Sequence, residues 1–65
     1  MNLIINGEDR QVASATLALL LEELAYDHDF LATAHNGDLV PAEDRAACVL
    51  QTGDRIEILS PMQGG

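Results

Sequence analysis

One stripe of leucines limits what this 65-residue chain can fold into. The leucines recur at positions i, i+3, i+4 and i+7, a spacing that places them on one face of a helix. Thr16 precedes them, and its hydroxyl can cap the helix by accepting a hydrogen bond from a free backbone N–H. We therefore predict a helix from Thr16 to about Ala25, with Glu22 and Glu23 away from the apolar face and Leu19 partly exposed. The stripe consists of Leu17, Leu20, Leu21 and Leu24.

Short extended segments joined by Asn-Gly turns surround this helix. Asn-Gly is the strongest short hairpin signal because both positions tolerate positive φ. Asn6-Gly7 separates the first two predicted strands, of which the second has Val12 as its core residue. Asn36-Gly37 separates the next two, and Pro41 ends the later one. The predicted strands cover residues 1–5, 9–13, 30–35, 38–40 and 55–59, with a helical turn at residues 42–47.

The order of these elements predicts an α+β fold of the β-grasp, or ubiquitin-like, type. A mixed sheet of four or five strands packed on one main helix buries a single leucine stripe. At this length we expect one domain, residues 1–60, followed by a flexible C-terminal tail, residues 61–65. A core this thin leaves little room for a deep pocket, which argues against a self-contained enzyme.

The alternation of side chains predicts an apolar patch on the open face of the sheet. In a β-grasp layout the first and last strands are neighbours, and successive side chains point to opposite faces. If Leu3, Ile56 and Ile58 face the helix, then Ile4 and Leu59 face solvent. We predict that Ile4 and Leu59 form a partner-binding patch, with ordinary surface exposure as the alternative.

The charge of the chain excludes two classes of partner. It has eleven acidic residues against three basic ones, for a formal net charge of −8. Its arginines are scattered and lysine is absent, so no cationic cluster is available for nucleic acid or an anionic membrane surface. The acidic balance steers the chain toward a basic partner surface instead.

Cysteine usage and hydropathy predict a reduced, cytoplasmic protein. The single cysteine, Cys48, cannot form an internal disulfide framework. The longest apolar run, Ala15 to Leu21, is far short of the roughly 20 residues that cross a bilayer. The first residues also lack the basic start of a signal peptide.

Three other candidates for chemistry favour structural interpretations. Cys48 has no flanking base or cation, so we predict a small buried apolar residue, not a sulfur relay. The run Asp27-His28-Asp29 predicts a solvated loop, because three consecutive side chains rarely converge on one metal ion. His35 is expected on a strand, with no Ser or Cys placed to be activated.

The last residues carry the predicted chemistry. The chain ends Ser60-Pro61-Met62-Gln63-Gly64-Gly65, and five residues past Ser60 reach at most about 17 Å when extended. Glycine lacks a Cβ, so Gly64 and Gly65 can enter a narrow channel and leave the carboxylate of Gly65 open to attack. We predict Gly65 as the reacting residue, with Gly64, Gln63 and Met62 contacting the partner. A carboxylate acylates only after activation, and the chain has no phosphate-binding loop or lysine to adenylate itself with ATP.

Three stretches resemble one known family, the ThiS sulfur carriers of thiamine biosynthesis. They are Met1 to Gly7, Asn36 to Pro41, and the ending Gly-Asp-x-Ile-x-Ile-x-Ser-Pro-Met-Gln-Gly-Gly at residues 53–65. The resemblance covers essentially the whole chain, and the tail is its most specific element. Ala42 is a departure, because members often carry a basic residue directly after the Val-Pro pair.

The resemblance implies a carrier and not an enzyme. It implies that an E1-like enzyme of the ThiF type adenylates Gly65, consuming ATP, and that a thiocarboxylate then forms there. A thiazole synthase of the ThiG type would receive the sulfur, which would originate from a donor such as a cysteine desulfurase. No bound cofactor and no metal are expected.

Two alternatives share the fold and the terminal Gly-Gly. One is a molybdopterin-type sulfur carrier, although such carriers are typically longer. The other is a ubiquitin-like protein modifier, which would end in an isopeptide bond to a lysine of another protein.

Overall fold

The computed structural model describes residues 1–27 and 29–60, which form one sheet and one main helix. The elements are β1 (Asn2–Ile5), β2 (Glu8–Gln11), α1 (Leu17–Glu23), β3 (Ala32–His35), β4 (Asp38–Val40), η1 (Ala42–Ala47, a 3-10 helix) and β5 (Arg55–Leu59). The five strands are ordered β2-β1-β5-β3-β4. β1 and β5 are parallel, and the other pairs are antiparallel. The predicted β-grasp fold is confirmed, with β1 and β5 as neighbours.

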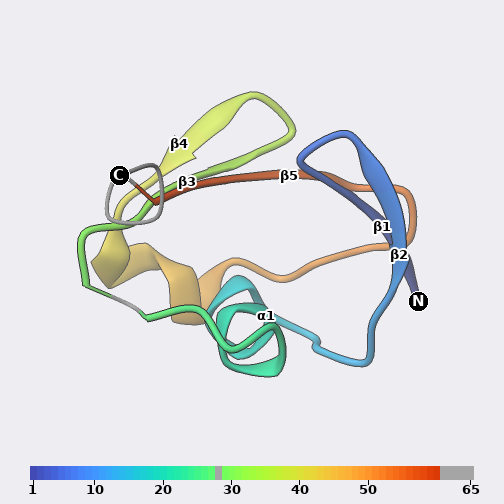
Figure 1. Cartoon of the computed structure of the whole chain (residues 1–65), viewed down its shortest axis with the longest axis horizontal. Helices are drawn as coiled ribbons and strands as arrows, with labels where there is room; N and C mark the ends of the chain where they lie inside the picture. The colour runs from blue at the N-terminus through green and yellow to red at the C-terminus, as the bar shows by residue number, and fades with distance from the viewer. Residues whose placement is uncertain (28, 61–65) are drawn as a thin grey trace.

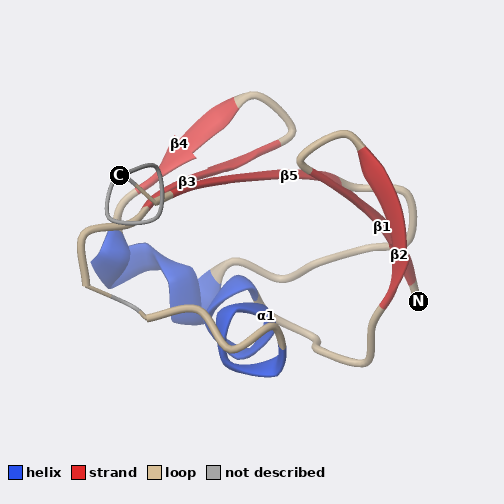
Figure 2. Cartoon of the chain, viewed as in Figure 1, coloured by secondary structure: helices blue, strands red, loops and turns tan. Residues whose placement is uncertain are grey.

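Both helical segments lie on one side of the sheet (Figures 1 and 2). The hydrophobic core fills the space between these helical segments and the sheet. Leu50, from the connection between η1 and β5, completes this core. The core residues are Leu3, Ile5, Val12, Leu17, Leu20, Leu21, Leu50, Ile56 and Ile58. The other face of the sheet therefore has no layer of described residues over it.

Helix α1 begins as predicted and ends earlier. Thr16 is its N-cap, and the Thr16 hydroxyl accepts a hydrogen bond from the Leu19 N–H at 3.3 Å. The helix ends at Glu23 because Ala25 adopts a positive φ of 63°. In this left-handed conformation the Ala25 N–H donates to the Glu22 carbonyl, and the Tyr26 N–H donates to the Leu21 carbonyl. Such an ending satisfies carbonyls that the helix leaves unpaired.

Strand β2 is displaced from its predicted position at residues 9–13. It pairs with β1 from Glu8 to Gln11, and buried Val12 then donates its N–H to the Met1 carbonyl at 2.8 Å. Pairing ends there because the next two N–H groups, of Ala13 and Ser14, donate to the carboxylate of Glu23. That carboxylate ties the end of the first hairpin to α1.

Strand β3 is also shorter than the predicted segment at residues 30–35. It begins at Ala32, because Phe30 has a φ of 62°, outside the extended region. Phe30 is 73% exposed and adds nothing to the core. The predicted strands at residues 38–40 and 55–59 and the helical turn at residues 42–47 are confirmed.

The two Asn-Gly turns both brace the central strand β5. Asn6 and Asn36 each have a φ of 51°, which confirms the predicted tight turns. The Asn6 side-chain amide donates to the Ile58 carbonyl at 3.1 Å, and its oxygen accepts from the Ile58 N–H at 2.8 Å. The Asn36 side-chain oxygen accepts from the Arg55 N–H at 2.8 Å. β5, which leads to Ser60 and the tail, is therefore held at both ends.

Arg45 is buried, although it is one of only three basic residues. Its Nε donates to the Thr33 hydroxyl at 3.1 Å, and an Nη donates to the Leu31 carbonyl at 2.9 Å. The Thr33 hydroxyl in turn donates to the Val40 carbonyl at 2.8 Å. The arginine therefore ties η1 to the β3–β4 hairpin.

Two carboxylates accept several hydrogen bonds and stay ionised more readily than usual. Asp54 lies 2.7 Å from Nε2 of His35 and accepts from the Gln51 N–H and the Asn36 amide. The His35 contact, with these other bonds, lowers the pKa of Asp54. The hydrogen bond from the Ser14 hydroxyl, with those from the backbone, lowers the pKa of Glu23.

These two lowered pKa values predict a loss of stability in acid. Their contribution is present above the ordinary pKa values, 3.8 for Asp54 and 4.5 for Glu23, and is lost as the pH falls through the lower folded values. The free energy of unfolding, measured with urea from pH 7 down to about pH 3, should therefore fall below about pH 4.5. Asp54→Asn and Glu23→Gln should each flatten this fall. Parallel curves for all three proteins would contradict the assignment.

Candidate partner-binding site

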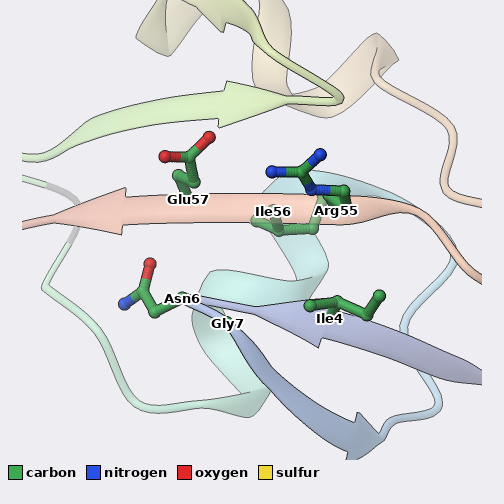
Figure 3. Close-up of a pocket in the computed structure, with 6 residues that line it drawn as sticks. All are labelled: Ile4, Asn6, Gly7, Arg55, Ile56 and Glu57. Atoms are coloured by element: carbon green, nitrogen blue, oxygen red, sulfur yellow. The ribbon is translucent and has the colours of Figure 1, made fainter.

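The open face of the sheet carries the exposed side chains of β5. Ile56 and Ile58 are buried against α1, while Arg55, Glu57 and Leu59 alternate with them and point away. Figure 3 shows Arg55 and Glu57 on β5 beside Ile4 on β1, on the side of the sheet opposite α1. The predicted outward orientation of Ile4 and Leu59 is confirmed, with Leu59 70% exposed and Ile4 half-buried.

Ile4 and Leu59 do not form one patch. Ile4 is paired with Arg55 at the start of the β1–β5 ladder, and Leu59 lies four residues further along β5. At the rise of an extended strand, that separation is about 13 Å. Each residue instead lines its own hollow, so the predicted single patch is corrected to two.

The two hollows meet at Glu57, which lines both. The first, of about 380 Å³, is lined by Ile4, Asn6, Gly7, Arg55, Ile56 and Glu57 (Figure 3). The second, of about 110 Å³, is lined by Ala32, Thr33, Ala34, Leu39, Glu57 and Leu59. They lie along β5 on the same face of the sheet, with a polar end at Arg55 and an apolar end at Leu59. We call this surface the β5 face.

Leu39 is a member of the apolar end that the sequence analysis missed. It is 74% exposed, and it lies opposite Ala34 in the β3–β4 ladder. Leu59 lies opposite Ala32 in the β3–β5 ladder, two residues before Ala34 on the same strand and so on the same face. Alternation with the inward Val40 could have indicated Leu39, but only the strand order brings Leu39 and Leu59 to one hollow.

The acidic residues lie mainly away from the β5 face. Among the strand residues, Asp9 and Glu57 share that face, because Asp9 is paired with Ile4 and Glu57 with Ala34. The others lie on the helical side, in the loops, or at inward-facing strand positions. The surface that contacts a partner here is therefore less acidic than the net charge of −8 suggests.

The described residues end at the apolar end of the β5 face. β5 ends at Leu59, and Ser60 follows it directly. The predicted reacting residue Gly65 and the predicted contacts Met62, Gln63 and Gly64 lie outside the described residues. The Leu39–Leu59 hollow is thus the hollow nearest in sequence to the predicted reacting segment.

The remaining candidates have structural environments. Cys48 is half-buried and packs against the core, and burial, with the charge of Asp54, raises the pKa of its thiol. The Asp29 N–H donates to the Asp27 carboxylate in a local turn, and His28 lies outside the described residues. Residues 1–27 and 29–60 contain no cluster of three or more His, Cys, Asp or Glu side chains suited to a metal ion. Within the same residues, no helix has the length and apolar character needed to cross a membrane.

Comparisons with known proteins agree on one family. The family model for the ThiS family matches residues 3–65. The crystal structure of a thiamine biosynthesis protein (ThiS) from Geobacter metallireducens superposes with a TM-score of 0.82 at 30% identity, covering 100% of both chains. An NMR solution structure of a thiamine biosynthesis protein from the same organism gives the same TM-score and identity, covering 88% of that chain.

A longer relative is also similar to the whole chain. A thiazole synthase of Paramagnetospirillum magneticum is 39% identical over 66 residues, an alignment that covers 100% of this chain and 20% of that protein. The chain therefore spans about a fifth of the length of this curated relative. On the family match and the agreement in fold, the chain belongs to the ThiS family.

Proposed function

We propose that the carboxylate of Gly65 carries sulfur as a thiocarboxylate and delivers it for thiazole formation. The observation that supports this most is the family match, which extends through the Gly-Gly ending to residue 65. The fold adds that the central strand, braced by Asn6 and Asn36, leads directly to Ser60. A partner that holds the globule would thus hold the start of the tail as well.

The proposed chemistry takes place at the terminal carboxyl group of Gly65. A carboxylate oxygen of Gly65 attacks the α-phosphorus of ATP within an E1-like enzyme, and pyrophosphate leaves. The terminal sulfur of a donor persulfide, such as that of a cysteine desulfurase, then attacks the carbonyl carbon, and AMP leaves with the original oxygen. A thiol cleaves the S–S bond of the resulting acyl disulfide, which releases the thiocarboxylate and leaves a disulfide on the donor side. The chain has no lysine, and one of its three arginines is buried. Because it therefore has few cations to stabilise the phosphates of ATP, the partner enzyme has to supply them.

The proposed recipient of the sulfur is a thiazole synthase of the ThiG type. The relative named thiazole synthase contains a segment similar to this entire chain, within a protein about five times longer. In that relative, a carrier-like segment and a longer stretch of other sequence therefore occur in one polypeptide. This supports a functional interaction between the carrier and a thiazole synthase.

Intact-mass spectrometry tests the proposal. After incubation with ATP, the E1-like enzyme and a sulfur donor, the chain should gain the mass difference between one sulfur and one oxygen atom. Omitting ATP is the control and should leave the mass unchanged. If an enzyme active on another carrier leaves this chain unmodified, the proposal is wrong. Heavier lysine-linked conjugates without free thiocarboxylate would identify a protein modifier instead.

A further inference from the structure

We propose that the ring of Phe30 is an apolar anchor by which the E1-like adenylating enzyme recognises this carrier. The enzyme receives the ring in an apolar pocket at the mouth of its active site, beside the route that leads Gly65 to ATP. This inference rests on the proposed function, since it names a residue that the first partner contacts. It does not involve the β5 face.

Phe30 lies where neither packing nor the backbone favours a phenylalanine. Its side chain is 73% exposed and lies outside the described hydrophobic core, although it is the single phenylalanine of the chain. Its φ of 62° is in the left-handed region, which glycine and asparagine adopt at lower cost than an aromatic residue. The residue therefore carries backbone strain and keeps apolar surface in water. A partner that covers the ring explains a residue type that the fold itself does not need.

Phe30 lies at the end of the sheet from which the chain continues toward Gly65. Ala32, two residues after Phe30, is paired with Leu59, and Ser60 follows Leu59. Figure 1 shows the start of β3 beside the end of β5. The five residues after Ser60 span at most about 17 Å, so an enzyme that holds Gly65 in its active site comes within that distance of Ser60. The surroundings of Ser60, which include Phe30, therefore lie at the mouth of the adenylating site.

The backbone on both sides of Phe30 is held in place. Leu31 packs against the hydrophobic core, and its carbonyl accepts a hydrogen bond from an Nη of buried Arg45 at 2.9 Å. On the other side, the Asp29 N–H donates to the Asp27 carboxylate at 3.0 Å. A contact residue that is positioned before binding loses less conformational entropy in the complex. The exposed ring is therefore suited to act as an anchor.

The charges beside Phe30 favour the adenylating enzyme as the partner that covers the ring. Asp29 directly precedes Phe30, and Asp27 lies two residues further back, so the ring has acidic groups on one side. An enzyme that adenylates Gly65 needs cations at its active site to stabilise the phosphates of ATP. Those cations attract the acidic groups, while a neighbouring apolar pocket takes the ring. In the proposed chemistry only this first partner binds ATP, so the complementarity favours it over the synthase.

Adenylation kinetics of the full-length chain with the purified E1-like enzyme of the same organism test the anchor. ATP–pyrophosphate exchange is measured at increasing carrier concentration. Phe30→Asn should raise KM for the carrier at least about tenfold, as expected when a central aromatic contact is lost. It should leave kcat within about twofold, because the ring binds the carrier and does not touch the reacting carbon. Phe30→Leu keeps an apolar side chain and should raise KM much less.

Val49→Asn is the matched control. Val49 is 64% exposed, and it is paired with Thr16 at the start of α1, in the helical layer and not at the end of β5. The control therefore removes a comparably exposed apolar side chain from another part of the surface. It should leave KM within about twofold. Equal effects of Val49→Asn and Phe30→Asn would contradict a specific anchor.

Urea unfolding of the same variants separates an anchor from a structural residue. Asparagine adopts a positive φ more readily than phenylalanine, so Phe30→Asn should raise the urea midpoint or leave it unchanged. A variant that is at least as stable as the unmodified chain, and yet needs more carrier for adenylation, shows that the ring acts outside the fold. A marked fall in the midpoint would show that the ring supports the fold, and the anchor would be wrong.

The outcomes separate this proposal from the proposed function. An unchanged KM for Phe30→Asn would overturn the anchor and leave the thiocarboxylate proposal intact. If Phe30→Asn weakens only binding to the purified thiazole synthase, measured by biolayer interferometry, the synthase covers the ring and the assignment to the adenylating enzyme is wrong. Self-association of the unmodified chain that Phe30→Asn abolishes would assign the ring to a second copy instead. Failure of the unmodified chain to be adenylated, by an enzyme active on another carrier, would contradict the proposed function itself.

Discussion

Deletion of Gly65 is expected to abolish thiocarboxylate formation and to leave the free energy of unfolding unchanged. The proposed reacting carbon is removed, and the new terminal carboxylate lies one residue short of the position the activating enzyme reads. Stability should not change, because every residue of the described core lies between Leu3 and Ile58. Intact mass after the activation reaction and urea unfolding of the same sample provide the two measurements.

The matched control is Gly65→Ala, which keeps the chain length and the carboxylate. Its added Cβ narrows the conformations available to the last residue, so the rate should fall without vanishing. Addition of one alanine after Gly65 should block the reaction as the deletion does. If the deletion variant gains sulfur on Gly64 at the normal rate, the position of the carboxylate does not matter and the proposed mechanism is wrong.

Replacement of Arg45 by methionine is expected to lower the free energy of unfolding by about 3 kcal/mol. Methionine fills similar space but donates no hydrogen bond, so the Leu31 carbonyl loses its bond and the Thr33 hydroxyl loses a donor. A buried acceptor left without a partner costs more than an ordinary hydrogen bond contributes. Since a domain of this size is stable by only about 3–10 kcal/mol, the loss should be large.

Urea unfolding at neutral pH measures the effect. Arg10→Met is the control, because Arg10 is exposed on β2, and it should change the free energy of unfolding by less than about 0.5 kcal/mol. Arg45→Lys should fall in between, because a single ammonium group cannot reproduce the planar fork of the guanidinium. Equal stability of Arg45→Met and the unmodified chain would show that these hydrogen bonds do not stabilise the native state.

Local patterns in the chain were sufficient for most of the fold. The leucine spacing and Thr16 located α1, and the two Asn-Gly pairs located both hairpins, because these signals depend on residues close in sequence. Segment ends were less accurate. Phe30 and Ala25 take positive φ values that neither residue type favours, so residue preferences did not indicate where those elements end.

The candidate site was predicted only in part. Alternation along β5 placed Leu59 outward correctly, but Leu39, which lines one hollow with Leu59, was not predicted. Partner binding by Ile4 and Leu59 stays a prediction. Leu39 was missed because its place beside Leu59 depends on the order and register of β3, β4 and β5, which the sequence pattern does not give. The roles of Gly65 and its neighbours stay a prediction from the tail sequence and the family.

By itself the sequence determined the periodicity, the turns, the acidic charge and the Gly-Gly ending, because each depends on residue types at short separations. The tertiary structure decided what depends on distant residues. It placed Arg45 in the core, used the Asn6 and Asn36 amides to brace β5, and brought Leu39 and Leu59 to one hollow at the end of β5. These contacts are set by strand order and register, which arise only when the whole sheet closes over α1.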